Sequence, residues 1–155
     1  MTELKQGDPA PDFDLETDQG RVGLADLKGR IVVLYFYPRD DTPGCTAEAI
    51  AFSGHKAEFD RIGAVVVGVS KDNPKSHAKF RAKYDLDLVL GHEPDTAVLE
   101  RYGAWVEKSM YGRSYMGIDR STFLIDRQGK LARIWRKVKV KGHADEVLAA
   151  AAGVG

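Results

Sequence analysis

The run Ile31-Val32-Val33-Leu34-Tyr35-Phe36-Tyr37 is followed at once by Pro38-Arg39-Asp40-Asp41-Thr42-Pro43-Gly44-Cys45. An unbroken β-branched and aromatic run of this kind predicts a strand that is buried on both faces. The second run has the Pro, Asp and Gly content of a turn, and the residues after it have helical periodicity. We therefore expect the chain to pass from a buried strand, through a tight loop, into a helix.

The helical pattern extends from Pro43 to about Ile62, and Gly63 is expected to end the helix. A second apolar run, Ala64–Val69, then predicts another buried strand, parallel to the first because a helix connects them. At helical spacing four residues share the inward face of the predicted helix: Cys45, Ala49, Phe52 and Phe59.

The other elements follow from alternation, turn residues and helix-start signals. They are an N-terminal hairpin of Asp12–Glu16 with Arg21–Leu24, a helix Pro74–Tyr84, a strand Leu86–Leu90, a short helix Pro94–Tyr102, an irregular loop Glu107–Gly117, a hairpin of Ser121–Asp126 with Lys130–Val140, and a helix Gly142–Ala152. This order predicts an α/β fold of the thioredoxin-like arrangement. We expect a mixed central sheet, helices on both faces and an N-terminal β-hairpin, in a single domain of residues 1–155.

Composition excludes several classes of function. The chain has 155 residues, of which 43% are hydrophobic, and its 23 Lys and Arg residues balance 23 Asp and Glu residues. No net charge recruits nucleic acid or an anionic membrane, so neither is expected as a partner. Residues 1–7 lack the apolar run of a signal peptide, and no apolar stretch is long enough to span a bilayer. We expect a soluble, cytoplasmic protein.

Cys45 is the one cysteine, so an internal disulfide is impossible. Thr42 is a suitable N-cap and Pro43 suits the first helical position, which places Cys45 at the third. Backbone N–H groups and the helix dipole favour an anion there, and a thiolate is the nucleophilic form of cysteine. On these residues alone, Cys45 is either a nucleophile or a buried structural cysteine.

The run Pro38-Arg39-Asp40-Asp41-Thr42-Pro43-Gly44-Cys45 resembles the Pro-x-x-x-Thr-x-x-Cys signature of peroxiredoxins. Other segments resemble the bacterioferritin-comigratory (Q-type) subfamily, and the resemblance extends from Gly7 to the final helix. These segments are Lys108–Gly112, Gly117–Asp126 and Val138–His143. The resemblance implies a thiol-dependent peroxidase of antioxidant defence.

The resemblance also implies roles for individual residues. Cys45 would attack one peroxide oxygen and become a sulfenic acid, Thr42 would orient the peroxide, and Pro38 would screen the site. Arg120 would contact both the thiolate and the peroxide, since its cationic fork suits charge that develops on the departing oxygen.

Two further residues complete the implied site. Glu48 would support the arginine, and the backbone N–H groups of Gly44 and Cys45 would bind the substrate. No cofactor or metal is implied. The four histidines, expected at the surface or at helix ends, lack the spacing of a metal site: His55, His77, His92 and His143.

Relatives often carry a second, resolving cysteine, and this chain departs from them. Many have it five residues after the first, where Ile50 stands here, and others have it on the following helix, where Tyr84 stands here. The chain therefore resembles a one-cysteine peroxiredoxin. Its sulfenic acid would need an external thiol, either thioredoxin or glutathione with glutaredoxin. We expect a monomer, or at most a weak homodimer.

The leading hypothesis is a peroxidase for hydrogen peroxide and organic hydroperoxides. The alternative is a redox sensor or binding module that uses oxidation of Cys45 as a switch without turnover. A thioredoxin-type oxidoreductase is disfavoured, because the chain has no Cys-x-x-Cys pair to exchange.

Overall fold

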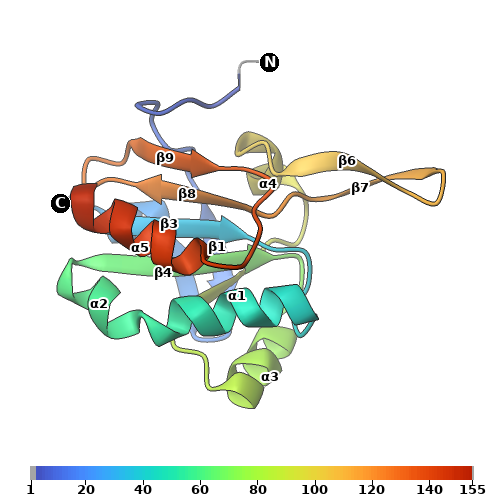
Figure 1. The fold of residues 1–155 in the computed structure, drawn as a ribbon, viewed down its shortest axis with the longest axis horizontal. Coiled ribbons are helices and arrows are strands. Elements are labelled where there is room, and N and C mark those ends of the chain that lie inside the picture. Colours follow the sequence, from blue (N-terminus) through green and yellow to red (C-terminus); the bar gives the residue numbers. More distant parts are fainter. Residues whose placement is uncertain (1–2, 155) are drawn as a thin grey trace.

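The computed structural model describes residues 3–154, so Met1, Thr2 and Gly155 of the expected domain lie outside it. A seven-stranded sheet forms its centre (Figure 1). The strands are β1 (Asp14–Thr17), β2 (Gly20–Gly23), β3 (Ile31–Phe36), β4 (Ala64–Ser70), β5 (Val89–His92), β8 (Ser121–Ile125) and β9 (Leu131–Trp135). Their order across the sheet is β2-β1-β5-β4-β3-β8-β9.

Strand β3 lies inside the sheet, and each of its residues is buried. It runs parallel to β4, with Ile31 opposite Ala64, and antiparallel to β8, with Phe36 opposite Ser121. Parallel and antiparallel pairs therefore meet at β3. The buried strand, the parallel unit and the mixed sheet expected from the sequence are confirmed.

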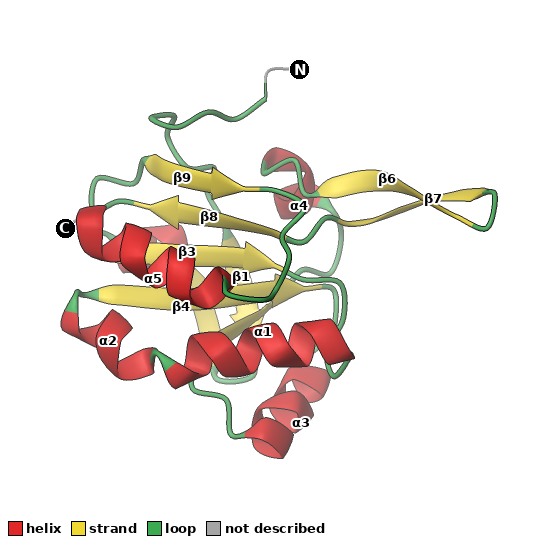
Figure 2. Ribbon diagram, in the orientation of Figure 1, coloured by secondary structure: helices red, strands yellow, loops and turns green. Residues whose placement is uncertain are grey.

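Helices cover both faces of the sheet, as expected (Figure 2). They are η1 (Leu24–Leu27, a 3₁₀ helix), α1 (Pro43–Gly54), α2 (Lys56–Arg61), α3 (Pro74–Tyr84), α4 (Ala97–Arg101) and α5 (His143–Val154). Side chains from α1, α2, α3 and α5 pack with Val33 and Tyr35 of β3, whereas η1 and α4 pack with Leu34 and Phe36 on the other face. Within residues 3–154, no helix has the length and apolar character needed to cross a bilayer.

One continuous helix was predicted from Pro43 to Ile62, and this prediction is wrong because the structure has two helices there, α1 and α2. The break is at His55, whose φ of −100° and ψ of 13° are not helical. The N–H of His55 bonds to the carbonyl of Phe52, three residues back, which tightens and ends the last turn of α1. Helix α2 then starts in a new direction and still buries Phe59, as its place on the inward face predicted.

Several predicted boundaries differ from the structure. The strand predicted at Leu86–Leu90 begins only at Val89, because pairing with β4 starts there and Leu86 joins the apolar cluster under α3. The helix predicted at Pro94–Tyr102 is reduced to α4, and the strand predicted to reach Val140 ends with β9.

The segment Glu107–Gly117, predicted as an irregular loop, is a hairpin of β6 (Trp105–Met110) and β7 (Arg113–Ile118). Both turn residues have positive φ, 52° at Tyr111 and 75° at Gly112, and a two-residue turn of this kind matches the twist of a hairpin. The hairpin projects from the body of the molecule, and its apolar residues lie largely in solvent (Figure 1). Those exposed are Met110, Tyr111, Tyr115 and Met116.

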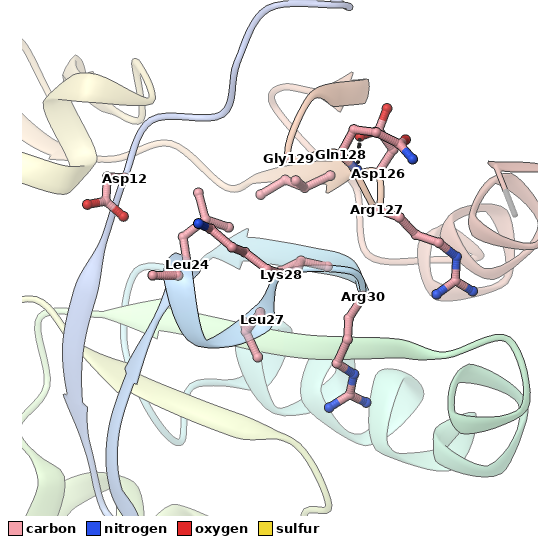
Figure 3. Close-up of a pocket in the computed structure, with 12 residues that line it drawn as sticks. Asp12, Leu24, Leu27, Lys28, Arg30, Asp126, Arg127, Gln128 and Gly129 are labelled. Atoms are coloured by element: carbon pink, nitrogen blue, oxygen red, sulfur yellow. Dashed lines mark hydrogen bonds between the residues drawn. The ribbon is translucent and has the colours of Figure 1, made fainter.

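A surface hollow of about 480 Å³ lies between η1 and the turn Asp126–Gly129 (Figure 3). The hollow adjoins the start of β3 and the end of β8. Cys45 and Arg120 are attached to the opposite ends of these two strands, so the hollow is separated from them by the length of the sheet.

Gly68 on β4 permits the close packing of an aromatic ring. A Cβ atom there would lie 2.7 Å from the hydroxyl oxygen of Tyr35, and the Tyr35 ring also stacks on Phe52 at 4.8 Å between ring centroids. We predict that Gly68→Ala lowers the free energy of unfolding by about 1 to 3 kcal/mol, because the ring has no space to move. Urea denaturation measures this loss. Gly153→Ala, where nothing lies within 4 Å, is the matched control, and an equal loss in both variants would contradict the packing argument.

Candidate active site

The loop from β3 to α1 positions Cys45 in the first turn of the helix. Pro43 is the first helical residue and Thr42 is the N-cap, in an extended conformation with φ −100° and ψ 154°. The side chain of Cys45 faces the core, and the residue is only 2% exposed. The helical slot expected from the sequence is confirmed, and a thiol in it lies where backbone N–H groups favour negative charge.

Arg120 joins this site from a distant part of the chain. It stands immediately before β8, whose first residue, Ser121, pairs with Phe36 at the end of β3. This register brings the arginine beside the loop. Its Nη2 donates to the Sγ atom of Cys45 at 3.3 Å, and its Nη1 donates to Oε1 of Glu48 at 2.7 Å. A cation thus bridges the thiol and a carboxyl group one helical turn away.

Gly44 allows the guanidinium to approach the helix. A Cβ atom at this position would lie 3.2 Å from Nη2 of Arg120, tighter than ordinary van der Waals contact. A residue with a side chain would therefore push the arginine away from Cys45. Close approach to a neighbouring group is one of the reasons for which a position requires glycine.

Burial sets the electrostatics of the pair. Glu48 is 1% exposed, and desolvation raises its pKa to about 7 against the opposing effect of Arg120. For Arg120, burial lowers the pKa, but the charges of Glu48 and Cys45 outweigh this and the net pKa is raised. The arginine is therefore a permanent cation. Among the described residues, Oε2 of Glu48 is a buried atom with no hydrogen-bond partner.

Thr42 and Pro38 lie on the loop itself. The hydroxyl of Thr42 donates to the carbonyl oxygen of Arg39 at 2.9 Å instead of capping the helix, so its lone pairs stay free to accept a hydrogen bond. Pro38 is exposed. Its screening role stays a prediction.

The two positions at which relatives carry a resolving cysteine both follow the site loop in sequence, one on α1 and one on α3. Ile50 is 47% exposed on α1. Tyr84, at the end of α3, donates its hydroxyl hydrogen to Oδ1 of Asp41 at 2.5 Å, and so holds the loop by a hydrogen bond. No histidine is hydrogen-bonded to Cys45 within residues 3–154, and no cluster of three or more potential metal ligands occurs there.

Sequence reasoning missed a buried polar group beside the loop. Asp40 is 8% exposed, and its carboxylate meets the hydroxyl of Tyr37 at 2.5 Å and Nδ1 of His77 at 2.8 Å. His77 was expected at the surface or at a helix end, and it lies in the first turn of α3 but is fully buried, so the surface alternative is wrong. Helical spacing gave a partial signal, because His77 stands three residues before the buried Phe80 and so shares its face of α3. The carboxylate that pairs with His77 could not be identified from the sequence.

The chain is similar to known proteins over most of its length. Residues 6–134 match the model of the AhpC/TSA family. A putative peroxiredoxin bcp of Coxiella burnetii is 48% identical over 94% of this chain and 97% of its own length, and the peroxiredoxin Bcp of Bacillus subtilis is 47% identical over 94% and 93%.

Solved structures show the same fold. The bacterioferritin comigratory protein of Xanthomonas campestris, described with alkyl peroxide reduction activity, superposes with a TM-score of 0.87 at 43% identity, over 91% of this chain and 90% of that one. The BcpB protein of Mycobacterium tuberculosis superposes with a TM-score of 0.85 at 33% identity, over 99% of each chain. The chain with Cys45 as its single cysteine belongs to the AhpC/TSA family, and within it to the Bcp or Q-type peroxiredoxins, which are thiol-dependent peroxidases.

Proposed function

We propose that this protein reduces hydrogen peroxide and organic hydroperoxides through Cys45 and is recycled by an external thiol. The contact between the Arg120 guanidinium and Sγ of Cys45 at 3.3 Å is the observation that supports this most. A cation hydrogen-bonded to sulfur stabilises the thiolate, and the same fork can stabilise a second negative atom nearby.

The first half of the reaction uses residues of this chain. The thiolate of Cys45 attacks one peroxide oxygen, an S–O bond forms and the O–O bond breaks. The attacked oxygen keeps its hydrogen, so the product is a sulfenic acid, and the other oxygen leaves as an alkoxide or hydroxide that takes a proton from water. Arg120 stabilises that departing charge, and Thr42 orients the peroxide by accepting its O–H hydrogen. Gly44 and Cys45 bind it through backbone N–H groups.

The second half requires other molecules. One thiol condenses with the sulfenic acid, which forms a mixed disulfide and releases water, and a second thiol then restores Cys45 and leaves as a disulfide. Thioredoxin, or glutathione with glutaredoxin, supplies the thiols in this proposal, and the protein acts as a monomer in the cytoplasm. The printed activity of the Xanthomonas relative supports an alkyl peroxide as one substrate.

The first experiment measures sulfenate formation at Cys45 by stopped flow, with hydrogen peroxide and then with an alkyl hydroperoxide. We expect Cys45→Ser to abolish the reaction and Arg120→Met to slow it by about 100-fold, because one stabilising donor to the developing charge is lost. Arg30→Met is the matched control, since Arg30 is exposed at the far end of β3. Oxidation of unaltered protein no faster than that of free cysteine would overturn the peroxidase proposal.

The second experiment tests turnover. Oxidised protein is mixed with thioredoxin, with glutathione alone, or with glutathione and glutaredoxin, and return of the Cys45 thiol is followed by mass spectrometry. We expect at least one of these to restore the thiol, whereas failure of all three would favour the sensor. Under a large peroxide excess without thiol, we expect addition of a second oxygen, because no cysteine of the chain intercepts the sulfenic acid.

The raised pKa of Glu48 predicts a pH dependence of stability. Between its ordinary value of 4.5 and about 7, the folded protein holds a proton that the unfolded chain has lost. The free energy of unfolding therefore falls as pH rises through this window, by up to about 3 kcal/mol. Denaturation at several pH values measures it. Glu48→Gln is expected to remove this part of the slope, and an unchanged slope would contradict the assignment.

A further inference from the structure

Helix α3 holds the loop that carries the reactive residues, through two consecutive carboxylates. Asp40 faces inward and contacts the first turn of α3, whereas Asp41 faces outward and contacts the last turn. Nζ of Lys83 donates to Asp41 at 2.8 Å and the hydroxyl of Tyr84 donates at 2.5 Å. These bonds fix a residue with a φ of 56°, a left-handed conformation that is unfavourable for most side chains but tolerated by Asp.

The inward contact is the more extensive. The carboxylate of Asp40 accepts hydrogen bonds from the hydroxyl of Tyr37 at 2.5 Å and from the hydroxyl of Ser76 at 2.8 Å. Its backbone N–H donates to Asp72 at 2.8 Å. The residue is therefore attached to β3, to α3 and to the turn after β4. Because it stands two residues before Thr42 and five before Cys45, these bonds fix the direction in which the loop enters α1.

Both ring nitrogens of His77 have hydrogen-bond partners. Its Nε2 lies 2.9 Å from the carbonyl oxygen of Gly91, which can only accept, so Nε2 carries a hydrogen. Its Nδ1 lies 2.8 Å from Oδ2 of Asp40, an oxygen that already accepts from Ser76. A contact of this length between a ring nitrogen and a carboxylate needs a hydrogen between them. That hydrogen lies on the ring or on the carboxyl group, and in either case it joins His77 to Asp40.

We propose that Asp40 and His77 are positioning residues for the peroxide reaction, which share the hydrogen bond that holds Thr42 in place beside Cys45. This proposal rests on the proposed function of Cys45. Neither residue touches the sulfur or the peroxide. They act through the loop: His77 anchors Asp40 to β5, and Asp40 sets the position from which the Thr42 hydroxyl meets the substrate.

Two reactions of Cys45 separate positioning from simple loss of structure. Alkylation by iodoacetamide needs only the thiolate, which Arg120 and the helix N-terminus supply. Peroxide reduction also needs Thr42 in place. We expect Asp40→Ala to slow sulfenate formation by about tenfold or more, since small misplacements of reacting groups have effects of this size, and to change alkylation by no more than about twofold. Asp87→Ala is the control, because Asp87 is exposed and distant from the loop in sequence.

A conservative variant guards against misfolding. Asp40→Ala leaves buried donors unpaired and can lower stability, whereas Asp40→Asn keeps the shape, and its amide can donate to Nδ1 of a neutral His77. We expect Asp40→Asn to recover most of the peroxide rate. In nitrogen-15 NMR spectra, the unaltered protein should show a hydrogen on Nε2 of His77 and the chemical shift of a hydrogen-bonded Nδ1, and Asp40→Ala should lose the hydrogen bond at Nδ1 alone.

The outcomes are distinct. Equal slowing of peroxide reduction and alkylation in Asp40→Ala, or an unchanged peroxide rate, would overturn the positioning role, and so would absence of a hydrogen bond at Nδ1 of His77 in the unaltered protein. Slow oxidation of the unaltered protein itself would instead overturn the proposed function, and the His77 spectra would still decide whether the hydrogen bond exists.

Discussion

The contact of one arginine with both a thiol and a carboxyl group governs the arrangement of this protein. Arg120 is 18% exposed in its side chain and faces Glu48, which is nearly fully buried, so both charges have lost most of their water. Such a pair persists only with good geometry, because the desolvation of each group opposes their attraction. The sheet supplies that geometry by placing the start of β8 against the end of β3. The helix supplies the rest, since Cys45 and Glu48 are one turn apart on the same side of α1.

Much of this fold could be predicted from local patterns. The continuous apolar runs of β3 and β4 predicted strands, because a strand covered on both faces requires apolar residues at every position. Element boundaries were less predictable. Position 55 ends α1 although the apolar spacing continues to Phe59, since the pattern records which side faces the core and not whether the axis is straight. The β6–β7 hairpin was missed for a different reason: both its faces lie largely in solvent, so no alternation of polar and apolar residues marked it.

The site could be predicted in part. The position of Cys45 followed from capping residues, and its link to Arg120 followed from resemblance, because 75 residues separate the two in sequence. The burial of Glu48 could not be predicted from the sequence of α1, because its partner, Arg120, comes from a distant part of the chain. The same limit hid Asp40 and His77, which are 37 residues apart and meet only when α3 packs beside the loop. Paired buried polar groups are a property of tertiary structure, and a single sequence displays each member as an isolated surface residue.

Gly44 couples the sequence of the loop to the position of Arg120. A Cβ atom at position 44 would lie 3.2 Å from Nη2 of Arg120, so the guanidinium is in tight contact with the space in which a side chain at position 44 would begin. A side chain at position 44 would displace the guanidinium by a few tenths of an ångström, and so would lengthen its contact with Cys45. A substitution at one position therefore changes the space at the other, although one position starts a helix and the other precedes a strand. The size of residue 44 thus limits how closely the cation of Arg120 can approach Cys45.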